Sequence, residues 1–298
     1  MVCGPRGRFR VSRETTPKGW CQVAGVDPAG LPPTTRIRVH GEVVSRETPT
    51  SGWKTVTAAE GEPGRTPDVA RTVFGDRLAA AERFAEMLRD YGVERGLIGP
   101  REVDRIWERH LLNSAVLAEL LPPNCRVVDV GSGAGLPGIP LAIARPDLEL
   151  TLLEPMARRV AWLQEVSTDI DLNVEVVRGR AEEGPVRQRL ADQDVVTARA
   201  VAPMARLAKW CLPLLRPEGK LLALKGSTAA EELERDAAAI QAAGGGRAEV
   251  VSCGDGVLEV PTTVVVVERA ARSQSGAGSP RTTSGRRRDD GRRTRKDR

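Results

Sequence analysis

The stretch Val128-Asp129-Val130-Gly131-Ser132-Gly133-Ala134-Gly135-Leu136-Pro137-Gly138 decides the fold of this 298-residue chain. Apolar residues lead directly into a glycine-rich turn, which is the order expected of a buried strand followed by a ligand-binding loop. Glycine suits such a turn because a side chain would hold the backbone away from the ligand. The helix that follows presents unpaired N–H groups to the same ligand. The stretch therefore predicts an α/β domain with a ligand site at the end of its first strand.

The sequence on either side of this loop alternates between short apolar runs and helical periods. The apolar runs predict strands at 126–130, 149–153, 174–177, 194–198, 220–224, 248–252 and 262–267. Helices are expected at 139–144, 157–168, 203–214 and 229–243. Seven strands with alternating helices predict a doubly wound, Rossmann-like α/β domain at 124–270.

An acid follows the loop at the distance typical of adenosine-binding folds. Glu154 ends the second predicted strand, where its carboxylate could accept hydrogen bonds from both ribose hydroxyls. The glycines of the loop are Gly131, Gly133, Gly135 and Gly138. Dinucleotide enzymes have the different spacing G-x-G-x-x-G, so the loop favours S-adenosylmethionine as the cofactor. We expect Gly131, Gly133, Gly135 and Glu154 to bind it.

The segment before this domain predicts a helical extension at 71–123. Apolar residues recur at helical spacing over 73–91 and again over 101–121, where Pro122 and Pro123 end the second helix. We expect these two helices to pack on the core as a lid or buttress. His110 lies on the second helix, and we favour a structural hydrogen-bonding role over catalysis for its ring.

Composition limits the remaining possibilities. The sequence has no apolar run of eighteen residues and no secretory signal pattern, which favours a cytoplasmic protein without membrane contact. Its five cysteines have no paired spacing, so we expect reduced thiols and no metal site. The formal net charge is +5, and eight of the fourteen residues at 285–298 are Arg or Lys. We expect a disordered basic tail at 271–298, either simply solvated or attracting RNA.

The first 70 residues are rich in Gly, Pro, Thr and Arg, and we expect them to be disordered. The pentapeptide Val11-Ser12-Arg13-Glu14-Thr15 recurs as Val44-Ser45-Arg46-Glu47-Thr48. The self-complementary DNA sequence GTTTCACGTGAAAC can encode it and resembles the centromere-like site of bacterial chromosome-partition proteins. We hypothesise that residues up to about 55 are translated upstream DNA and that Val56 is the true start. A short recognition motif used twice by the protein is the alternative.

Further candidate residues follow the third, fourth and fifth predicted strands, at the carboxyl edge where such sheets bind ligands. Arg180-Ala181-Glu182-Glu183 should border the adenine. The Arg199 guanidinium could hold the methionyl carboxylate or the target base, or form a surface ion pair. Lys225 could contact RNA phosphate or cap the sheet edge.

Several motifs together resemble the bacterial glucose-inhibited division protein B family. They are Trp107-Glu108-Arg109-His110-Leu111-Leu112-Asn113-Ser114, the loop extended through Leu136-Pro137-Gly138-Ile139-Pro140, Thr197-Ala198-Arg199-Ala200 and Leu222-Ala223-Leu224-Lys225-Gly226. The resemblance covers about 73–269. Asn113 departs from it, because many members have Asp there, and Glu154 stands where Asp is frequent.

The resemblance implies a class I methyltransferase sheet and methylation of guanine N7 in 16S ribosomal RNA. It implies cofactor contacts at Gly131, Leu136, Ala181, Glu182 and Arg199, and it brings Arg180, Arg199 and Lys225 to the RNA. Arg199 is expected to act by positioning, because N7 needs no general base. We expect a monomer that acts on free 16S rRNA or on the assembling small subunit.

Two other classes of function stay open from the residues alone. A nicotinamide-dependent oxidoreductase would use a similar loop and acid, but the sequence lacks the matching third glycine and a Tyr-x-x-x-Lys motif. A non-enzymatic nucleic-acid-binding module in chromosome partition would explain the basic tail and the repeated pentapeptide. Cofactor binding separates the first alternative, and specific binding of the palindromic duplex would favour the second.

Overall fold

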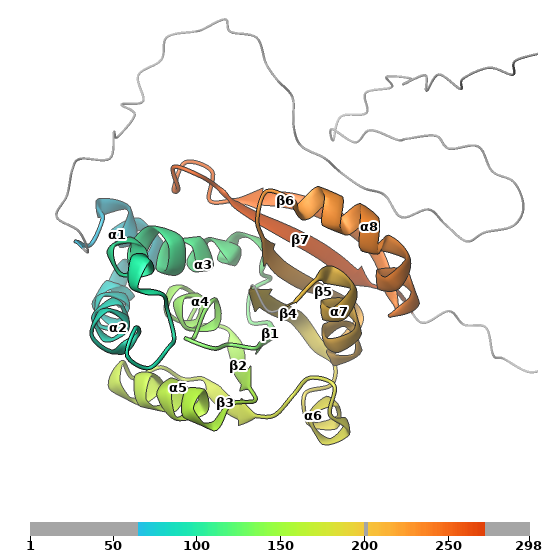
Figure 1. Ribbon diagram of the computed structural model, residues 1–298, viewed down its shortest axis with the longest axis horizontal. Helices are drawn as coiled ribbons and strands as arrows, with labels where there is room; N and C mark the ends of the chain where they lie inside the picture. The colour runs from blue at the N-terminus through green and yellow to red at the C-terminus, as the bar shows by residue number, and fades with distance from the viewer. Residues whose placement is uncertain (1–64, 200–201, 272–298) are drawn as a thin grey trace, which may run out of the picture.

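One seven-stranded sheet organises the part of the chain that the structure describes, residues 65–199 and 202–271 of a computed structural model. Its strands are β1 (Arg126–Val130), β2 (Glu149–Glu154), β3 (Glu175–Arg178), β4 (Gln193–Arg199), β5 (Leu215–Lys225), β6 (Gly245–Cys253) and β7 (Thr262–Arg269). The strand order is β3-β2-β1-β4-β5-β7-β6 (Figure 1). Strands β1 to β5 pair in parallel, whereas β7 runs antiparallel to both β5 and β6.

Helices cover both faces of this sheet because its strands are apolar on both sides. They are α4 (Gly138–Ala144), α5 (Ala157–Asp169), α6 (Gly184–Arg189), α7 (Met204–Cys211) and α8 (Ala229–Ala242), and a 3-10 turn, η5 (Leu212–Leu214), follows α7. Along β1, Val127 packs on the face covered by α4 and α5, and Val128 on the face covered by α6, α7 and α8. This alternation follows from the two-residue period of a strand.

The N-terminal helical segment, residues 68–120, packs on the same face as α4 and α5 (Figure 1). It consists of α1 (Asp68–Phe74), η1 (Gly75–Arg77), α2 (Leu78–Tyr91), η2 (Pro100–Arg105), η3 (Ile106–Leu112), α3 (Asn113–Ala115) and η4 (Val116–Leu120). The element η3 is a π-helix, and η1, η2 and η4 are 3-10 helices. Buried side chains from this segment join those of the sheet in one hydrophobic core.

The predicted elements are found, with three differences. The expected helix over 73–91 is broken at Gly75, whose positive φ of 51° ends α1. The expected helix over 101–121 changes between 3-10, π and α geometry, which its apolar period could not reveal. Helix α6 was not predicted, because six residues are too few to show a helical period.

The predictions for residues 1–64 and 272–298 concern residues outside those that the structure describes; they include the repeated pentapeptide, the Val56 start and the basic tail. Order was expected to begin near residue 71, and α1 begins slightly earlier, at Asp68.

Candidate active site

The glycine loop after β1 is held tightly against the end of β2. The backbone N–H groups of Gly131 and Ser132 both donate to the Leu153 carbonyl, at 2.8 and 3.2 Å. Gly131, Gly133 and Gly135 have positive φ values of 73°, 57° and 97°. A Cβ on Gly135 would lie 2.3 Å from Ile139 Cδ1, so a larger residue there would force the Ile139 side chain to move. The loop thus presents bare backbone at the carboxyl end of the central strand.

The predicted acid lies beside this loop. Glu154 ends β2 and is almost fully buried, with 1% of its surface exposed. Its Oε2 accepts a hydrogen bond from Gly133 N–H at 3.0 Å, and Oε1 accepts one from Met156 N–H at 2.9 Å. Each carboxylate oxygen can accept more than one hydrogen bond, so capacity remains for the two hydroxyls of a ribose.

Asp129 fixes the other end of the loop from inside the sheet. Its Oδ2 accepts the Gly138 N–H at 3.1 Å, and Oδ1 accepts the Thr197 hydroxyl at 3.0 Å. Thr197 is the β4 residue paired with Asp129, which explains the contact. Burial raises the pKa of the Asp129 carboxyl to about 6, although its hydrogen bonds oppose the rise. We infer that Asp129 supports the loop rather than contacting a ligand, because none of its surface is exposed.

Arg199 approaches the loop from the opposite side to Glu154, because β4 and β2 flank β1. Its guanidinium donates to Ser114 Oγ at 3.2 Å and to the Arg109 carbonyl at 3.0 Å, and Nη2 lies 2.7 Å from His110 Nδ1. Burial lowers the pKa of Arg199. Arg199 therefore does not form the surface ion pair that we considered. Its contact with His110 was not predicted.

The residues after β3 lie next to Glu154. The Gly179 N–H donates to the Glu154 carbonyl at 3.2 Å. Arg180 and Glu182 are exposed, while Ala181 is buried and its carbonyl accepts the Arg187 Nε–H at 3.1 Å. The structure thus brings these three residues to the edge where the glycine loop lies, and their contacts with adenine or RNA stay predictions.

The Lys225 side chain is largely buried and paired, whereas a contact with RNA phosphate needs an exposed ammonium. Its ammonium donates to the Ala202 carbonyl at 2.8 Å and to Glu232 Oε1 at 3.0 Å, and only 11% of its side chain is exposed. Glu232 Oε1 also accepts the Met204 N–H at the start of α7. These bonds fit the alternative that Lys225 caps the sheet edge, so the RNA contact is a prediction without structural support.

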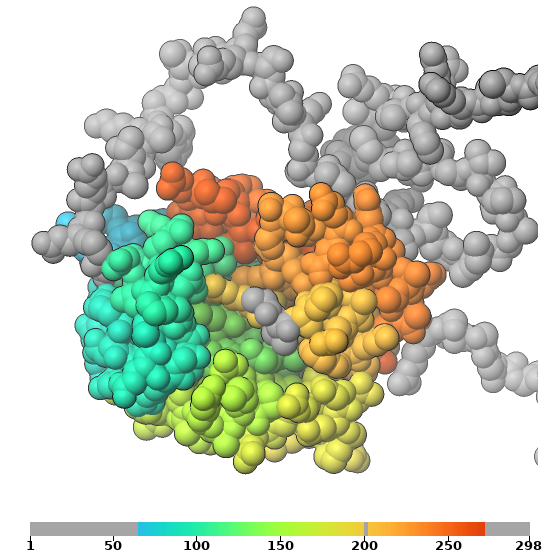
Figure 2. All heavy atoms as spheres, viewed as in Figure 1, coloured from blue at the N-terminus to red at the C-terminus, as the bar shows by residue number. Residues whose placement is uncertain are grey.

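Space for a ligand is visible over the middle of the sheet. Figure 2 shows the surface hollowed between the teal atoms of the N-terminal helical segment and the yellow and orange atoms of α6 to α8. In the same view, Figure 1 labels β1 and β4 at this place. Leu136, in the loop that leads into α4, is buried.

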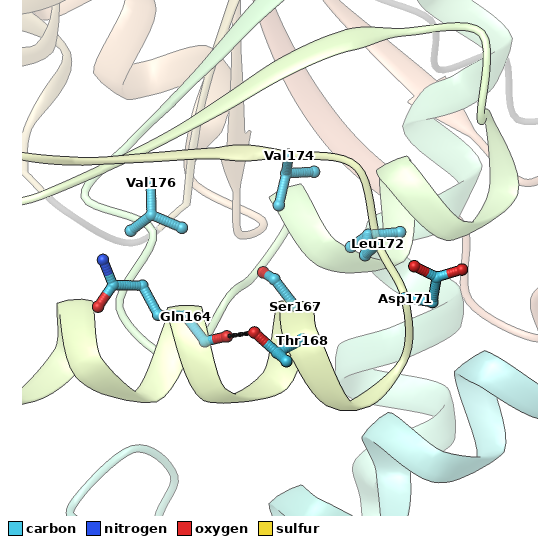
Figure 3. Close-up of a pocket in the computed structure, with 7 residues that line it drawn as sticks. All are labelled: Gln164, Ser167, Thr168, Asp171, Leu172, Val174 and Val176. Carbon is cyan, nitrogen blue, oxygen red and sulfur yellow. Dashed lines mark hydrogen bonds between the residues drawn. The ribbon is translucent and has the colours of Figure 1, made fainter.

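A second depression lies elsewhere and contains none of the predicted site residues. It lies between the end of α5 and the approach to β3, and it is lined by Gln164, Ser167, Thr168, Asp171, Leu172, Val174 and Val176 (Figure 3). Because α5 runs away from the carboxyl edge, this groove lies at the opposite end of the sheet from Glu154. We assign it no function.

The residues present fit S-adenosylmethionine. The loop glycines leave backbone free for close approach, and a Cβ on Gly133 would have no neighbour closer than 3.6 Å, the Gly131 carbonyl oxygen. Glu154 supplies acceptors for hydroxyl groups, and Arg199 supplies a charged donor for a carboxylate. With the strand order and the antiparallel β7, these features define a class I S-adenosylmethionine-dependent methyltransferase.

Comparison with known proteins agrees with this class. The family model described as GidB, rRNA small subunit methyltransferase G, matches residues 77–260. The chain is 57% identical over 209 residues to ribosomal RNA small subunit methyltransferase G of Mycolicibacterium paratuberculosis, covering 70% of this chain and 84% of the relative. The corresponding protein of Mycobacterium marinum is 56% identical over 219 residues, covering 73% and 96%. The chain therefore belongs to the rRNA small subunit methyltransferase G family.

Among solved structures, a SAM dependent methyltransferase from Aquifex aeolicus aligns with a TM-score of 0.42 and 19% identity, over 60% of this chain and 97% of that one. The oxidoreductase and partition-module alternatives find no support in the family or its members. Within the described residues, no helix is both long and apolar enough to span a membrane.

Proposed function

We propose that this protein transfers a methyl group from S-adenosylmethionine to N7 of one guanine in small-subunit (16S) ribosomal RNA. When bound, S-adenosylmethionine supplies the methyl group as an electrophile on a positively charged sulfur. Gly131, Gly133, Gly135 and Leu136 would hold it by close backbone approach, Glu154 by its ribose, and Ala181 and Glu182 at its adenine.

The observation that supports the choice of N7 is that two candidate bases near the loop, Asp129 and His110, are already engaged. Asp129 accepts two hydrogen bonds and is fully buried, and His110 Nδ1 faces the Arg199 guanidinium. Guanine N7 carries a free lone pair at neutral pH, so attack from this atom needs no base. The site's contribution is to hold the reactants in line, which can supply roughly 7 to 11 kcal/mol of the barrier reduction.

Other RNA methylation chemistries have less support. A C5 pyrimidine methyltransferase needs a thiolate nucleophile, yet the three cysteines within the described residues, Cys125, Cys211 and Cys253, are all buried. Burial raises the pKa of the Cys125 thiol to about 11 and that of Cys253 to about 12, and it raises that of Cys211 still further. Methylation of exocyclic amines typically uses an Asn-Pro-Pro-Tyr motif, which the sequence lacks.

The finer details of the substrate belong to the same proposal. Arg180 is exposed at the rim of the site and would contact RNA phosphate. We expect the protein to act as a monomer, in the cytoplasm where the RNA is made. Free 16S RNA and the assembling small subunit are both candidate substrates. The target guanine must be unstacked or in a loop for its edge to be reached.

Transfer of labelled methyl groups from S-adenosylmethionine to 16S RNA tests the proposal, with wild type compared with Arg199→Ala and Arg199→Lys. We expect Arg199→Ala to lower kcat/KM roughly 10- to 100-fold, the cost of a lost charged hydrogen bond. Lysine should restore activity only in part because it lacks the planar fork. Full activity and cofactor affinity in a folded Arg199→Ala protein would overturn the assigned role of Arg199. Absence of transfer by the wild type would overturn the proposed function.

A further inference from the structure

The guanidinium of Arg199 is held by one short stretch of the N-terminal helical segment. Its three bonding partners are the Arg109 carbonyl, His110 Nδ1 and Ser114 Oγ. A guanidinium has five N–H donors. The contacts with described residues use three of these donors. The Nε–H group and one Nη1–H group therefore remain to bind a ligand. The side chain is therefore fixed on one side and available on the other.

The contact with His110 determines the state of its ring. Because a guanidinium only donates, the Nδ1 atom that lies 2.7 Å from Arg199 Nη2 must be unprotonated and must accept. The ring proton is then on Nε2, which lies 2.8 Å from Glu102 Oε2. Burial and the charges of Arg199 and Arg109 lower the pKa of His110 to about 4, against the opposing effect of Glu102. The ring is neutral at physiological pH.

Glu102 organises both of the nearest partners of Arg199. Its Oε2 faces the His110 ring, while its Oε1 accepts a hydrogen bond from Arg109 Nη1 at 3.0 Å. Arg109 in turn offers its carbonyl to Arg199. Arg109 and His110 lie in the π-helix η3, a geometry often found at functional sites. The Glu102 carboxylate, the His110 ring and the Arg199 guanidinium thus lie in sequence from η2 to the end of β4, with 2.8 Å between Glu102 Oε2 and His110 Nε2 and 2.7 Å between His110 Nδ1 and Arg199 Nη2.

We propose that His110 is a positioning residue for methyl transfer: its neutral ring, oriented by Glu102, fixes the Arg199 guanidinium so that its free donors are presented to the bound reactants. This inference rests on the proposed function of Arg199. It goes beyond the structural hydrogen-bonding role expected for His110, because it assigns the ring an effect on the rate of transfer.

A pair of substitutions separates positioning from simple packing. The amide oxygen of His110→Asn lies near the place of Nδ1 and can still accept from Arg199, whereas the oxygen of His110→Gln lies near the place of Nε2. We expect kcat to fall roughly 10- to 100-fold in the Gln variant, a loss of the size seen when a group that orients a metal ligand is removed. The Asn variant should keep most of the wild-type kcat, even though the smaller side chain lowers its Tm more.

The outcomes are distinct. Equal kcat for wild type and both variants, or losses that follow Tm and not the position of the acceptor, would overturn the role of His110. Inactivity of the wild type on small-subunit RNA would instead count against the proposed function.

A second readout does not depend on activity. Nitrogen NMR of the ring in the cofactor-free protein should show a neutral His110 protonated at Nε2 at pH 7. The sequence has only two histidines, so loss of the signal in His110→Gln assigns it. A ring protonated at Nδ1, or on both nitrogens, would overturn the proposal whatever the activity.

Discussion

The Glu154 carboxylate, at the end of β2, accepts a hydrogen bond from the backbone N–H of Gly133 at 3.0 Å. This bond joins the glycine loop after β1 to the acid at the end of β2, two candidate features of the cofactor site that are 21 residues apart in the sequence. The carboxylate shapes the loop, and in the proposed function it also accepts hydrogen bonds from the ribose, so its removal should affect the binding of S-adenosylmethionine in two ways.

We expect Glu154→Ala to weaken S-adenosylmethionine binding roughly 10- to 100-fold, because hydrogen bonds to a charged group contribute about 1.5 to 3 kcal/mol. Glu154→Gln keeps one acceptor oxygen and should lose less. Calorimetric titration gives both Kd values. Glu234→Gln, on the exposed side of α8, is the matched control and should bind as the wild type does. An unchanged Kd for Glu154→Ala would remove Glu154 from the cofactor site.

Gly135→Ala should destabilise the fold. The added Cβ would lie 2.3 Å from Ile139 Cδ1, at a backbone φ of 97° that alanine rarely adopts. Overpacking of this kind costs about 1 to 3 kcal/mol in free energy of unfolding. Gly184→Ala, at the start of α6, is the control because its Cβ would meet nothing within 4 Å. Urea unfolding of the two variants measures the difference, and equal effects would show that the loop tolerates a side chain.

How much of this site could be predicted depends on distance along the chain. The glycine loop and Glu154 follow from a local pattern, and β1 has the predicted bounds of 126–130. The partners of Arg199 are 85 to 90 residues away, in a segment whose apolar period predicts a helix but does not show which of its polar groups meet β4. Lys225 was assigned from its place at a strand end, but its partner Glu232 is in the next helix.

The sheet was predictable for a similar reason. Apolar runs identify strands, and all seven were found. Their directions depend on connections and packing, so the sequence did not predict that β7 inserts antiparallel between β5 and β6.

Lowering the pH should reduce the free energy of unfolding, because the buried His110 ring resists protonation in the folded protein. Its pKa is about 4 in the folded protein and about 6.5 when unfolded, so the unfolded chain binds more protons between these values. The stabilisation is complete above about pH 6.5 and is lost as the pH falls toward 4, at up to about 1.4 kcal/mol per pH unit. The charged groups facing the ring are Glu102, Arg109 and Arg199.

The difference in unfolding free energy between wild type and His110→Asn isolates this effect, and it should shrink from pH 7 to pH 5. Asp129 acts in the opposite direction, because its folded pKa of about 6 is raised, so its contribution declines as the pH rises from about 4 to 6. Since Asp129 is present in both proteins, it cancels in the comparison. A difference that stays constant with pH would contradict a buried neutral His110.

Arg145 should stabilise the junction between the N-terminal helical segment and the sheet. It forms a bidentate ion pair with Asp147, in which both hydrogen bonds are 2.7 Å long. It also donates to the carbonyls of Ala118, Leu121 and Pro122. We expect Arg145→Lys to lower the free energy of unfolding by about 1 to 3 kcal/mol, because several carbonyls lose a donor. Cofactor affinity in the folded protein should not change. Arg71→Lys, on the exposed side of α1, is the control, and equal stability of the two variants would contradict this role.

The most direct test of the central claim is to map the methylated atom. Free 16S RNA and assembled small subunits would be incubated with the protein and S-adenosylmethionine, and the RNA then treated with borohydride and aniline, which cleave the chain at N7-methylguanine. We predict cleavage at a single guanine, present with the wild type and strongly reduced with Arg199→Ala. Cofactor binding without any aniline-sensitive guanine in either substrate would contradict N7 methylation of this RNA.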